Sequence, residues 1–487
     1  MNKPDTNIEL DKIEINEDIV RYIGKLADDL GYRVYIVGGY VRDYYLKRQR
    51  EDFDFTVIGD SIAFAEKIAE LNRTKAVVYT AFRTALVPLR GYKLEFVGTR
   101  KEEYLPDSRK PIVSEGTLED DLKRRDFTIN AMAVSLNKDT FGEVTDIFDG
   151  KSALEDKILK TPLEPEITFS DDPLRMLRAV RFASQLGFNI DESAFLAIRA
   201  MSGRISIVSR ERIADEFFKI MKSAKPGSGF RILYETGLLE YVFPELAKLS
   251  GIETVQDIDR NYAHKDVLLH SLQVLDCISE STDNVWLRIA ALVHDIAKPQ
   301  TKRFIKGSGW SYHGHEEFGA RKLKHIFNQM KFSKEHLPYI EKLVRMHHRP
   351  MALVDEGVTD SAVRRLASQA GDALEDLFML CRADITTKNP NLSAKYLNNY
   401  DIVTQKVIEV QEKDKLREFQ SPVRGDEIMQ ICKLPPSQTV GYIKTTIEEA
   451  ILDGIIPNEY DAAKQYFMEN KDTWLLEFKG SKKAKKQ

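Results

Sequence analysis

Two stretches near the N-terminus decide the fold: Gly38-Gly39-Tyr40-Val41-Arg42-Asp43 and Asp52-Phe53-Asp54-Phe55-Thr56-Val57. The first follows Val34-Tyr35-Ile36-Val37, whose β-branched and aromatic residues predict a strand, and its two glycines predict a turn into a helix. The alternation in the second predicts a strand with Asp52 and Asp54 on one face and apolar side chains on the other. Residues 18–60 are therefore expected to run helix, strand, turn, helix, strand.

The polar residues of these stretches predict a metal-dependent nucleotide site. Gly38 and Gly39 let backbone N–H groups approach an anion where a helix begins. Asp52 and Asp54 repel each other unless a cation lies between them, and Mg²⁺ prefers one or two carboxylates together with substrate phosphates. Two such ions activate a hydroxyl and stabilise a leaving pyrophosphate. Glu95 is a candidate third carboxylate from a neighbouring strand. The competing interpretation is a solvated edge strand without a metal.

The rest of the chain predicts an α+β fold, in which a mixed-sheet head with helices is followed by an all-α region. Residues 77–89 and 92–97 are expected to form two strands joined at Arg90-Gly91. Residues 101–123 are rich in charge and contain two prolines, so we interpret them as a mobile loop. After Asp171 the spacing of apolar residues is helical.

Ordered motifs over residues 30–220 resemble the family of tRNA nucleotidyltransferases and bacterial poly(A) polymerases, within the polymerase beta superfamily. After the glycine turn and the Asp-x-Asp strand they comprise residues 124–131 (RRDFTINA), 149–156, 171–182 (DDPLRMLRAVRF) and 209–216. The resemblance implies Mg²⁺-dependent nucleotidyl transfer, with Asp52 and Asp54 as catalytic carboxylates and Glu95 as a third. Ten residues are expected to contact the nucleotide: Gly38, Gly39, Arg42, Arg125, Asp126, Asn130, Asp172, Arg175, Arg178 and Arg181.

Residues 171–182 resemble the part of the family that reads the nucleobase. We expect a helix with a stripe of four charged residues: Asp172, Arg175, Arg178 and Arg181. Cytosine and adenine both present an amino donor beside a ring-nitrogen acceptor, which a carboxylate and a guanidinium can match. Uracil and guanine present the reverse order and would leave buried polar groups unpaired. The resemblance gives this role to Asp172 and Arg175, so CTP and ATP would be selected without a template. Asp171 stands where the family usually has Glu, which leaves its contribution open.

The product that the resemblance implies is the CCA end of tRNA. Family members that add only CC lack a flexible element such as residues 101–123, which disfavours that product. Poly(A) polymerases carry a long basic C-terminal extension and no histidine-rich block, whereas this chain has a short basic end and an intact block. CCA addition is therefore favoured, with A-only addition as the alternative.

The histidine-rich block resembles the HD metal-dependent phosphohydrolases. Its expected mononuclear site consists of His270, His294, Asp295 and Asp384, and a second ion would use His315 with His347, His348 or both. Imidazole and carboxylate ligands suit Ni, Mn, Zn or Fe more than Mg²⁺. Such a centre activates water towards a phosphate ester, for which the resemblance implies RNA 3′ or 2′,3′-cyclic phosphates. A further alternative is that the chain acts mainly as this hydrolase. The remaining histidines are interpreted as surface or packing residues: His264, His313, His325 and His336.

Five segments are expected along the chain. They are a nucleotidyltransferase head (1–150), a helical neck and body for base selection and RNA binding (151–255), an HD metal-binding domain (256–390), a helical tRNA-binding tail (391–478) and a basic, disordered end (479–487).

Composition bounds the partners and the location. The 72 basic and 76 acidic residues leave a net charge of −4, so an RNA partner must be met by local charge and by shape rather than by a uniformly basic surface. No apolar run reaches the roughly 20 residues that span a membrane. Residues 1–17 carry no signal-peptide segment, and three scattered cysteines form no disulfide framework, so we expect a cytoplasmic protein. The oligomeric state stays open.

Overall fold

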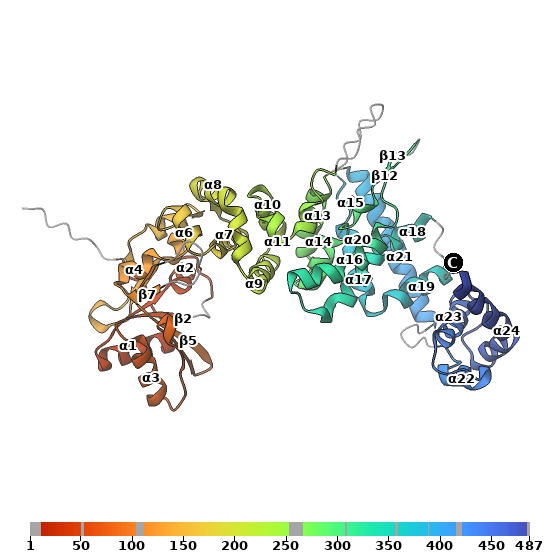
Figure 1. The fold of residues 1–487 in the computed structure, drawn as a ribbon, viewed down its shortest axis with the longest axis horizontal. Helices are drawn as coiled ribbons and strands as arrows, with labels where there is room; N and C mark the ends of the chain where they lie inside the picture. Colours follow the sequence, from red (N-terminus) through yellow and green to blue (C-terminus); the bar gives the residue numbers. More distant parts are fainter. Residues whose placement is uncertain are drawn as a thin grey trace, which may run out of the picture. The chain divides into compact units, whose positions relative to one another are not determined.

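The computed structural model describes residues 11–49, 53–103, 112–252, 266–306, 309–355, 359–387, 389–414 and 421–484. The chain forms two compact units, Met1–Ala247 and Lys248–Gln487 (Figure 1). Each is described by itself. The finer five-segment division expected above stays a prediction.

The core of the first unit is a seven-stranded mixed sheet. Its strand order is β3-β4-β5-β2-β1-β8-β9, and β2 and β5 run parallel whereas the other neighbouring strands described are antiparallel. The strands are β1 (Arg33–Val37), β2 (Phe53–Ile58), β3 (Val77–Tyr79), β4 (Thr84–Leu89), β5 (Tyr92–Gly98), β8 (Met132–Ser135) and β9 (Val144–Asp146).

The predicted order of helix, strand, turn, helix and strand is confirmed. Helix α1 (Asp18–Leu30) precedes β1, and Gly38 turns the chain into α2 (Gly39–Tyr45). In β2, Phe53, Phe55 and Val57 are buried, as the alternation predicted. The Phe55 ring stacks on Phe96 of β5 at 5.0 Å, and α3 (Ser61–Leu71) covers that part of the sheet. Because the apolar side chains of β2 point into the core, Asp54 points to the opposite face of the sheet.

Two details of the head differ from the sequence prediction. A short 3-10 turn, η1 (Thr80–Phe82), interrupts the expected strand at 77–89. The prediction of a mobile loop over residues 101–123 is wrong for the parts that the structure describes. Strand β6 (Arg100–Glu103) pairs with β7 (Ile112–Glu115), and helix α4 (Leu118–Lys123) follows. A capping box between Thr117 and Asp120 starts α4, which is why this charged segment is helical. Residues 104–111 lie outside the described part of the chain.

The rest of the first unit is helical, as the α+β assignment predicted. Its helices are α5 (Gly150–Glu155), α6 (Pro165–Asp171), α7 (Leu174–Leu186), α8 (Glu192–Met201), α9 (Arg210–Met221), α10 (Pro226–Glu235), α11 (Leu239–Val242) and α12 (Pro244–Ala247). Strands do not stop at residue 171 as expected, because β10 (Ile158–Leu159) pairs with β11 (Asn189–Ile190). Helices α7 and α9 pack against each other.

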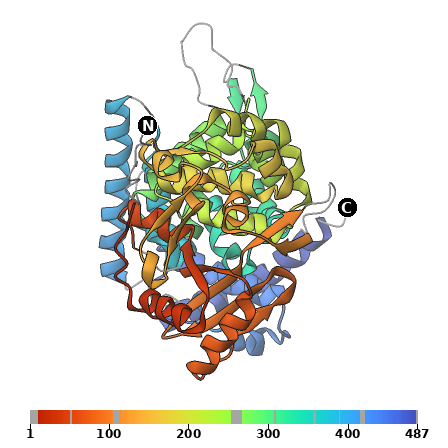
Figure 2. The same ribbon diagram turned by 90° about the vertical axis from the view of Figure 1, so that its left-hand side faces the viewer.

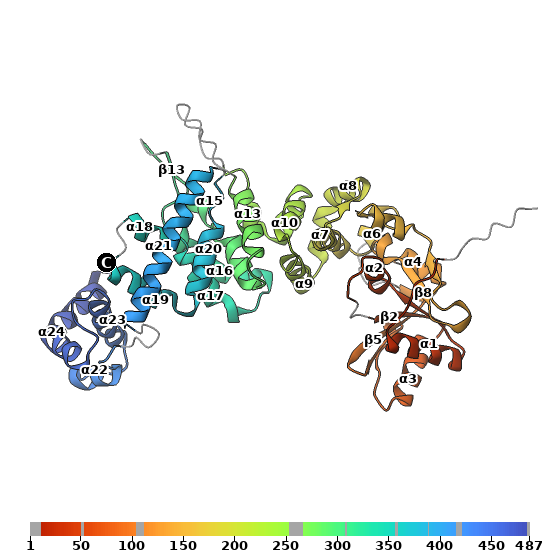
Figure 3. The same ribbon diagram turned by 180° about the vertical axis from the view of Figure 1, so that it is seen from behind.

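The second unit is a helical assembly with one small ribbon, β12 (Arg303–Ile305) and β13 (Gly309–Ser311) (Figure 2). Its helices are α13 (Val267–Ser279), α14 (Val285–Val293), α15 (Lys298–Thr301), α16 (His315–Met330), α17 (Leu337–Met346), α18 (Arg349–Asp355), α19 (Asp360–Ala370), α20 (Leu374–Ala383), α21 (Pro390–Asp414), α22 (Gly425–Cys432), α23 (Gln438–Leu452) and α24 (Tyr460–Ala484). Helices α22, α23 and α24 share their own apolar core around Phe467 (Figure 3). Among the described helices, none is long and apolar enough to cross a membrane.

Candidate nucleotide site and metal centre

Two carboxylates meet on the polar face of the central strands. Asp54 of β2 is the register partner of Glu95 on the parallel strand β5. Both side chains are half-buried. Burial, and then the charge of Asp54, raise the pKa of Glu95. A cation between the two carboxylates relieves this repulsion, which is the chemistry that the sequence predicted. Asp52, the other predicted carboxylate, lies outside the described residues.

The glycine turn is required by its surroundings. Gly38 has φ 68° and ψ −120°, a conformation that side-chain-bearing residues rarely adopt. A Cβ at this position would also lie 2.9 Å from Nη1 of Arg125. Arg125 is held there by Asp121, whose Oδ2 lies 3.1 Å from Arg125 Nη2. The absence of a side chain at Gly38 therefore leaves the space that the Arg125 guanidinium occupies. Gly39 follows as the first residue of α2.

Asp121 was missed as a site residue. Its carboxylate is fully buried between two guanidiniums, with Oδ1 accepting from Arg124 at 2.5 Å. The hydroxyl of Thr56 on β2 donates to Oδ2 at 3.2 Å. Burial alone would raise the pKa of Asp121, but Arg124 and Arg125 outweigh it and lower that pKa. Its spacing of three and four residues from the two arginines is the sequence signal that could have revealed this role.

Four of the predicted nucleotide contacts form one polar network. Arg178 Nε donates to Oδ2 of Asp126 at 2.6 Å, and Asn130 Nδ2 donates to Oδ1 of Asp126 at 3.0 Å. Arg42 Nη1 in turn donates to Oδ1 of Asn130 at 2.9 Å. Burial opposes the charge of Asp126, but Arg178 outweighs it and lowers the pKa of Asp126 to about 2. The carboxylate is therefore ionised at neutral pH and fixes the arginine from α7.

Three guanidiniums gather around the ring of Phe182. The centres of the Arg42, Arg178 and Arg181 groups lie 5.2, 5.4 and 4.1 Å from its centroid. Burial, and then the charge of Arg178, lower the pKa of Arg181 to about 10. Each of the three guanidiniums is also paired with a carboxylate, namely Asp43, Asp126 or Glu216, so the cluster is a network of ion pairs that fixes the arginines in place.

The residues predicted to read the base do not form the single helical stripe that was expected. Helix α7 begins at Leu174, so Asp172 precedes it and accepts from the Leu174 N–H at 3.1 Å. Pro173 lies between Asp172 and the helix, so the charged stripe on α7 begins at Arg175 rather than at Asp172. Arg175 is 8% exposed and donates to the carbonyls of Thr168 and Arg124. The apolar side predicted to anchor the helix is buried: Leu174, Leu177 and Val180.

Helix α9, which carries most of the motif at 209–216, contacts this region through two ion pairs. Nη2 of Arg212 lies 3.1 Å from Oδ2 of Asp172. Glu216 and Arg181 form a buried ion pair at 3.3 Å. Asp172 and Arg181 are therefore both positioned by the same helix.

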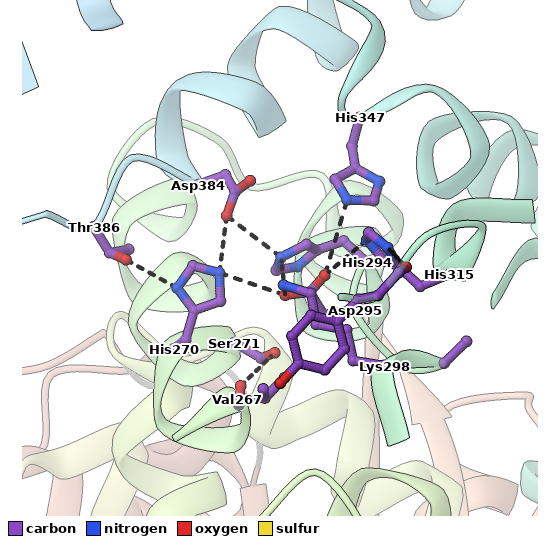
Figure 4. A network of polar contacts seen from close by, with 12 residues as sticks. Val267, His270, Ser271, His294, Asp295, Lys298, His315, His347, Asp384 and Thr386 are labelled. Carbon is purple, nitrogen blue, oxygen red and sulfur yellow. Dashed lines mark hydrogen bonds and ion pairs between the residues drawn. The ribbon is translucent and has the colours of Figure 1, made fainter. Parts of the chain in front are cut away.

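A second constellation lies in the other unit, where the predicted metal ligands converge (Figure 4). They fall into two groups, each with its ligand atoms within 4.8 Å of one another. One group comprises His270, His294 and Asp384, and the other comprises Asp295, His315, His347 and His348. All seven predicted ligands are thus brought together.

Asp295 lies between the two groups. Its Oδ2 is 3.2 Å from Nε2 of His294 and 3.7 Å from Nε2 of His270. Its Oδ1 is 3.2 Å from Nε2 of His315 and 3.9 Å from Nε2 of His347. The prediction placed Asp295 with the first ion alone, whereas its two oxygens face one group each. One carboxylate can therefore bridge two cations.

The histidine rings are oriented for metal binding. Nδ1 of His294, His315 and His347 contacts the backbone carbonyls of the residues three positions earlier, at 2.7, 2.8 and 2.7 Å. The opposite nitrogens are buried and, together with Oδ1 of Asp295, make no hydrogen bond within the described residues, although they lie close to one another. Buried lone pairs that converge without hydrogen bonds fit a shared divalent cation. Nδ1 of His270 is fixed by Thr386 Oγ1 at 2.9 Å.

The histidines and carboxylates of this cluster shift one another's pKa values. Burial opposes protonation of His294, but Asp295 and Asp384 outweigh it and raise the pKa of His294 to about 10. Burial alone would raise the pKa of Asp295, yet His294 and Lys298 hold it well below its usual range. A divalent ion bound by His294 would replace the proton on its ring, so metal binding would release protons.

Lys298 was missed by sequence reasoning. Its Nζ lies 2.5 Å from Oδ2 of Asp295, and its position three residues after that ligand was the available signal. The other histidines behave as predicted where they are described, since His313 and His325 are exposed and His336 stacks on Trp286. His264 lies outside the described residues.

Comparisons with known proteins give one consistent result. Family models match a poly(A) polymerase head domain at residues 34–160, a probable RNA- and SrmB-binding site of polymerase A at 187–249 and an HD domain at 267–386. A multifunctional CCA protein of Methylococcus capsulatus is 30% identical over 72% of this chain and 81% of its own length. An A-adding tRNA nucleotidyltransferase of Geobacter sulfurreducens is 34% identical over 47% of this chain, but the match covers only 26% of that protein. The structure of the Thermotoga maritima CCA-adding enzyme with tRNA has the same fold, with a TM-score of 0.60, 19% identity and coverage of 93% and 95% of the two chains.

Proposed function

Since the chain belongs to the family of tRNA nucleotidyltransferases, which are enzymes, we propose that it adds CCA to tRNA 3′ ends from CTP and ATP and releases pyrophosphate. The observation that carries this proposal is the register pairing of Asp54 with Glu95 on the polar face of the central strands. That pair lies in the same unit as the arginine cluster around Phe182.

The side chains divide the work as follows. Asp54 and Glu95, with Asp52, hold Mg²⁺, which supplies charge neutralisation for the triphosphate and activation of the attacking hydroxyl. Three arginines and Asn130 bind the triphosphate and ribose: Arg42, Arg178 and Arg181. Asp172 and Arg175 read the base, and Arg212 keeps the Asp172 carboxylate in place. Helices α22–α24 are proposed to hold the body of the tRNA.

The second candidate is addition of the terminal A alone. The Geobacter relative, which is named an A-adding enzyme, is 34% identical over its matched region, and a CCA-adding enzyme of Anoxybacillus flavithermus is 39% identical over a region of similar length, so sequence identity does not separate the two products. Both candidates use the same carboxylates, so the geometry of the head does not separate them. The difference lies in whether CTP is accepted.

One incubation series separates the candidates. Three tRNAs, ending before the first C, after CC and after CCA, are offered each nucleoside triphosphate singly and in mixtures with Mg²⁺. A CCA-adding enzyme extends the first with CTP and ATP and leaves the third unchanged. An A-only enzyme extends only the second. Repeated addition of A to the third tRNA contradicts both.

We also propose that the metal centre is a phosphohydrolase acting on RNA 3′ or 2′,3′-cyclic phosphates. The bridging position of Asp295 between two histidine groups supports it. Ni, Mn, Zn or Fe suits these ligands better than Mg²⁺. Two reactions are measured with Mn²⁺ and Ni²⁺ in wild type, His294→Ala and the exposed control His325→Ala: opening of a 2′,3′-cyclic end to a phosphomonoester, and release of phosphate from an RNA with a 3′ phosphate. Equal activity in all three contradicts a hydrolase at this centre.

A further inference from the structure

The ribbon formed by β12 and β13 contributes none of the residues proposed for nucleotide transfer. It projects from the helices of its unit in all three views (Figures 1, 2 and 3). Phe304 is the register partner of Trp310, and their rings meet edge to face at 5.4 Å. Phe304 is nonetheless 60% exposed. Trp310 is half-buried, so the ribbon presents chiefly the Phe304 ring to solvent, and an exposed aromatic ring of this kind fits a partner with flat, apolar faces.

The ribbon is also basic in an acidic protein. Between Asp295 and Glu316 the sequence contains no acidic residue and four basic ones: Lys298, Lys302, Arg303 and Lys306. Nζ of Lys302 lies 4.4 Å from the centre of the Trp310 ring. Positive charge beside exposed aromatic rings is the combination that binds single-stranded nucleic acid, since bases stack on the rings and phosphates meet the charges.

Both ends of the ribbon are attached to the metal centre. At one end, Lys298 contacts the bridging carboxylate of Asp295 and lies 5.7 Å from the ring of Tyr312. At the other end, the carbonyl of Tyr312 faces Nδ1 of His315 at 2.8 Å. RNA that stacks on the ribbon would therefore lie next to residues that contact the metal ligands.

We propose that the ribbon binds the single-stranded 3′ end of an RNA, by stacking on Phe304 and Trp310 and by phosphate contacts with Lys302 and Arg303. This substrate assignment rests on the phosphohydrolase function proposed for the metal centre, whereas the binding itself does not. A duplex is excluded as the ligand because its bases are already stacked on one another.

The test uses Trp310 as a local reporter. Trp286→Phe together with Trp474→Phe leaves Trp310 as the single tryptophan of the chain, which has three. Titration with an eight-nucleotide single-stranded RNA is expected to quench its fluorescence, and the matching duplex is expected to leave it unchanged. Because the signal comes from the ribbon, RNA bound at the nucleotide site does not contribute.

Two variants in this background complete the experiment. Phe304→Ala removes one stacking partner and is expected to weaken binding about 5- to 100-fold. Ile305→Ala is the matched control, since it is 41% exposed on the same strand but on the opposite face, and should change affinity less than about twofold. Mn²⁺ binding by calorimetry, unchanged in both variants, shows that the unit is folded.

Several results would overturn the proposal: equal quenching by the duplex, equal losses in the two variants, or no quenching at all. A change in sedimentation on Phe304→Ala with unaltered RNA titration would mean that the ribbon contacts a second copy of the chain instead. If RNA binds as expected but no phosphate is released with any metal, the hydrolase proposal fails and the ribbon's RNA binding stands.

Discussion

Asp54 and Glu95 are register partners on the two parallel strands at the centre of the sheet. Each carboxylate comes from a different strand, and the charge of Asp54 contributes to the raised pKa of Glu95. Two like charges held this close are unfavourable unless a cation joins them. Arg100 and Arg125 offset part of this repulsion, and the pairing is consistent with the metal site proposed for this face of the sheet.

Removing either carboxylate should abolish nucleotide incorporation. Asp54→Asn and Glu95→Gln are each expected to lower the rate at least about 100-fold, because each deletes a metal ligand. Incorporation of labelled ATP into a tRNA ending in CC measures the effect. Glu66→Gln, an exposed carboxylate on α3, is the control and should retain the wild-type rate. Retained activity in Asp54→Asn would show that the metal lies elsewhere.

Because of the ion pair between Asp126 and Arg178, the free energy of unfolding should decrease at acidic pH. The pKa of Asp126 is lowered to about 2, so its contribution is fully present above the unfolded value of 3.8 and is lost as pH falls towards 2. Asp126→Asn should remove about 2 kcal/mol of this pH-dependent free energy of unfolding. Urea unfolding between pH 5 and 2.5 measures it. Asp139→Asn, on an exposed turn, should keep the wild-type acid dependence.

Removing only one partner of the buried ion pair between Arg181 and Glu216 should lower the free energy of unfolding strongly. Glu216→Ala leaves the Arg181 guanidinium buried without its carboxylate, which is expected to lower the free energy of unfolding by about 3 kcal/mol. The double variant Arg181→Met with Glu216→Leu should recover most of that loss, since both charges are gone. Denaturant unfolding of wild type, Arg181→Met, Glu216→Leu and the double variant forms a double-mutant cycle. Additive losses in the double variant would argue against direct coupling.

The metal centre should bind two divalent ions that share Asp295. Asp295→Ala is expected to abolish binding of both, because each group loses the oxygen that faces it. His315→Ala should leave one ion per chain. Titration with Mn²⁺ by calorimetry, together with metal analysis after dialysis, counts the ions. His325→Ala is the control, and one ion retained in Asp295→Ala would show that the carboxylate does not bridge.

Much of this arrangement was predictable from local patterns. The alternation around Asp54 placed its carboxylate opposite the apolar face of β2, and the glycine pair placed the turn before α2. The resemblance to the HD phosphohydrolases indicated all seven candidate metal ligands that the structure groups together. These features were accessible because each depends on residues that are near neighbours in the sequence or carry a distinctive chemistry.

What sequence reasoning missed depends on contacts between distant segments. Asp121 looked like one more charge in a polar loop, and only the fold buries it between Arg124 and Arg125, next to β2. Asp172 was expected on a helix that begins two residues later. The two oxygens of Asp295 face different histidine groups, which no spacing rule encodes.

The parallel pairing of β2 with β5 also has a consequence for synthesis of the protein. These strands are far apart in the chain, with α3, β3 and β4 between them, and β5 must insert beside β2 to complete the polar face. A nascent chain that has exposed only the glycine turn and β2 has neither a closed sheet nor a second carboxylate. The pair of Asp54 and Glu95 therefore exists only once this strand pairing forms, so truncated products of translation that end before β5 should be inert towards nucleotides.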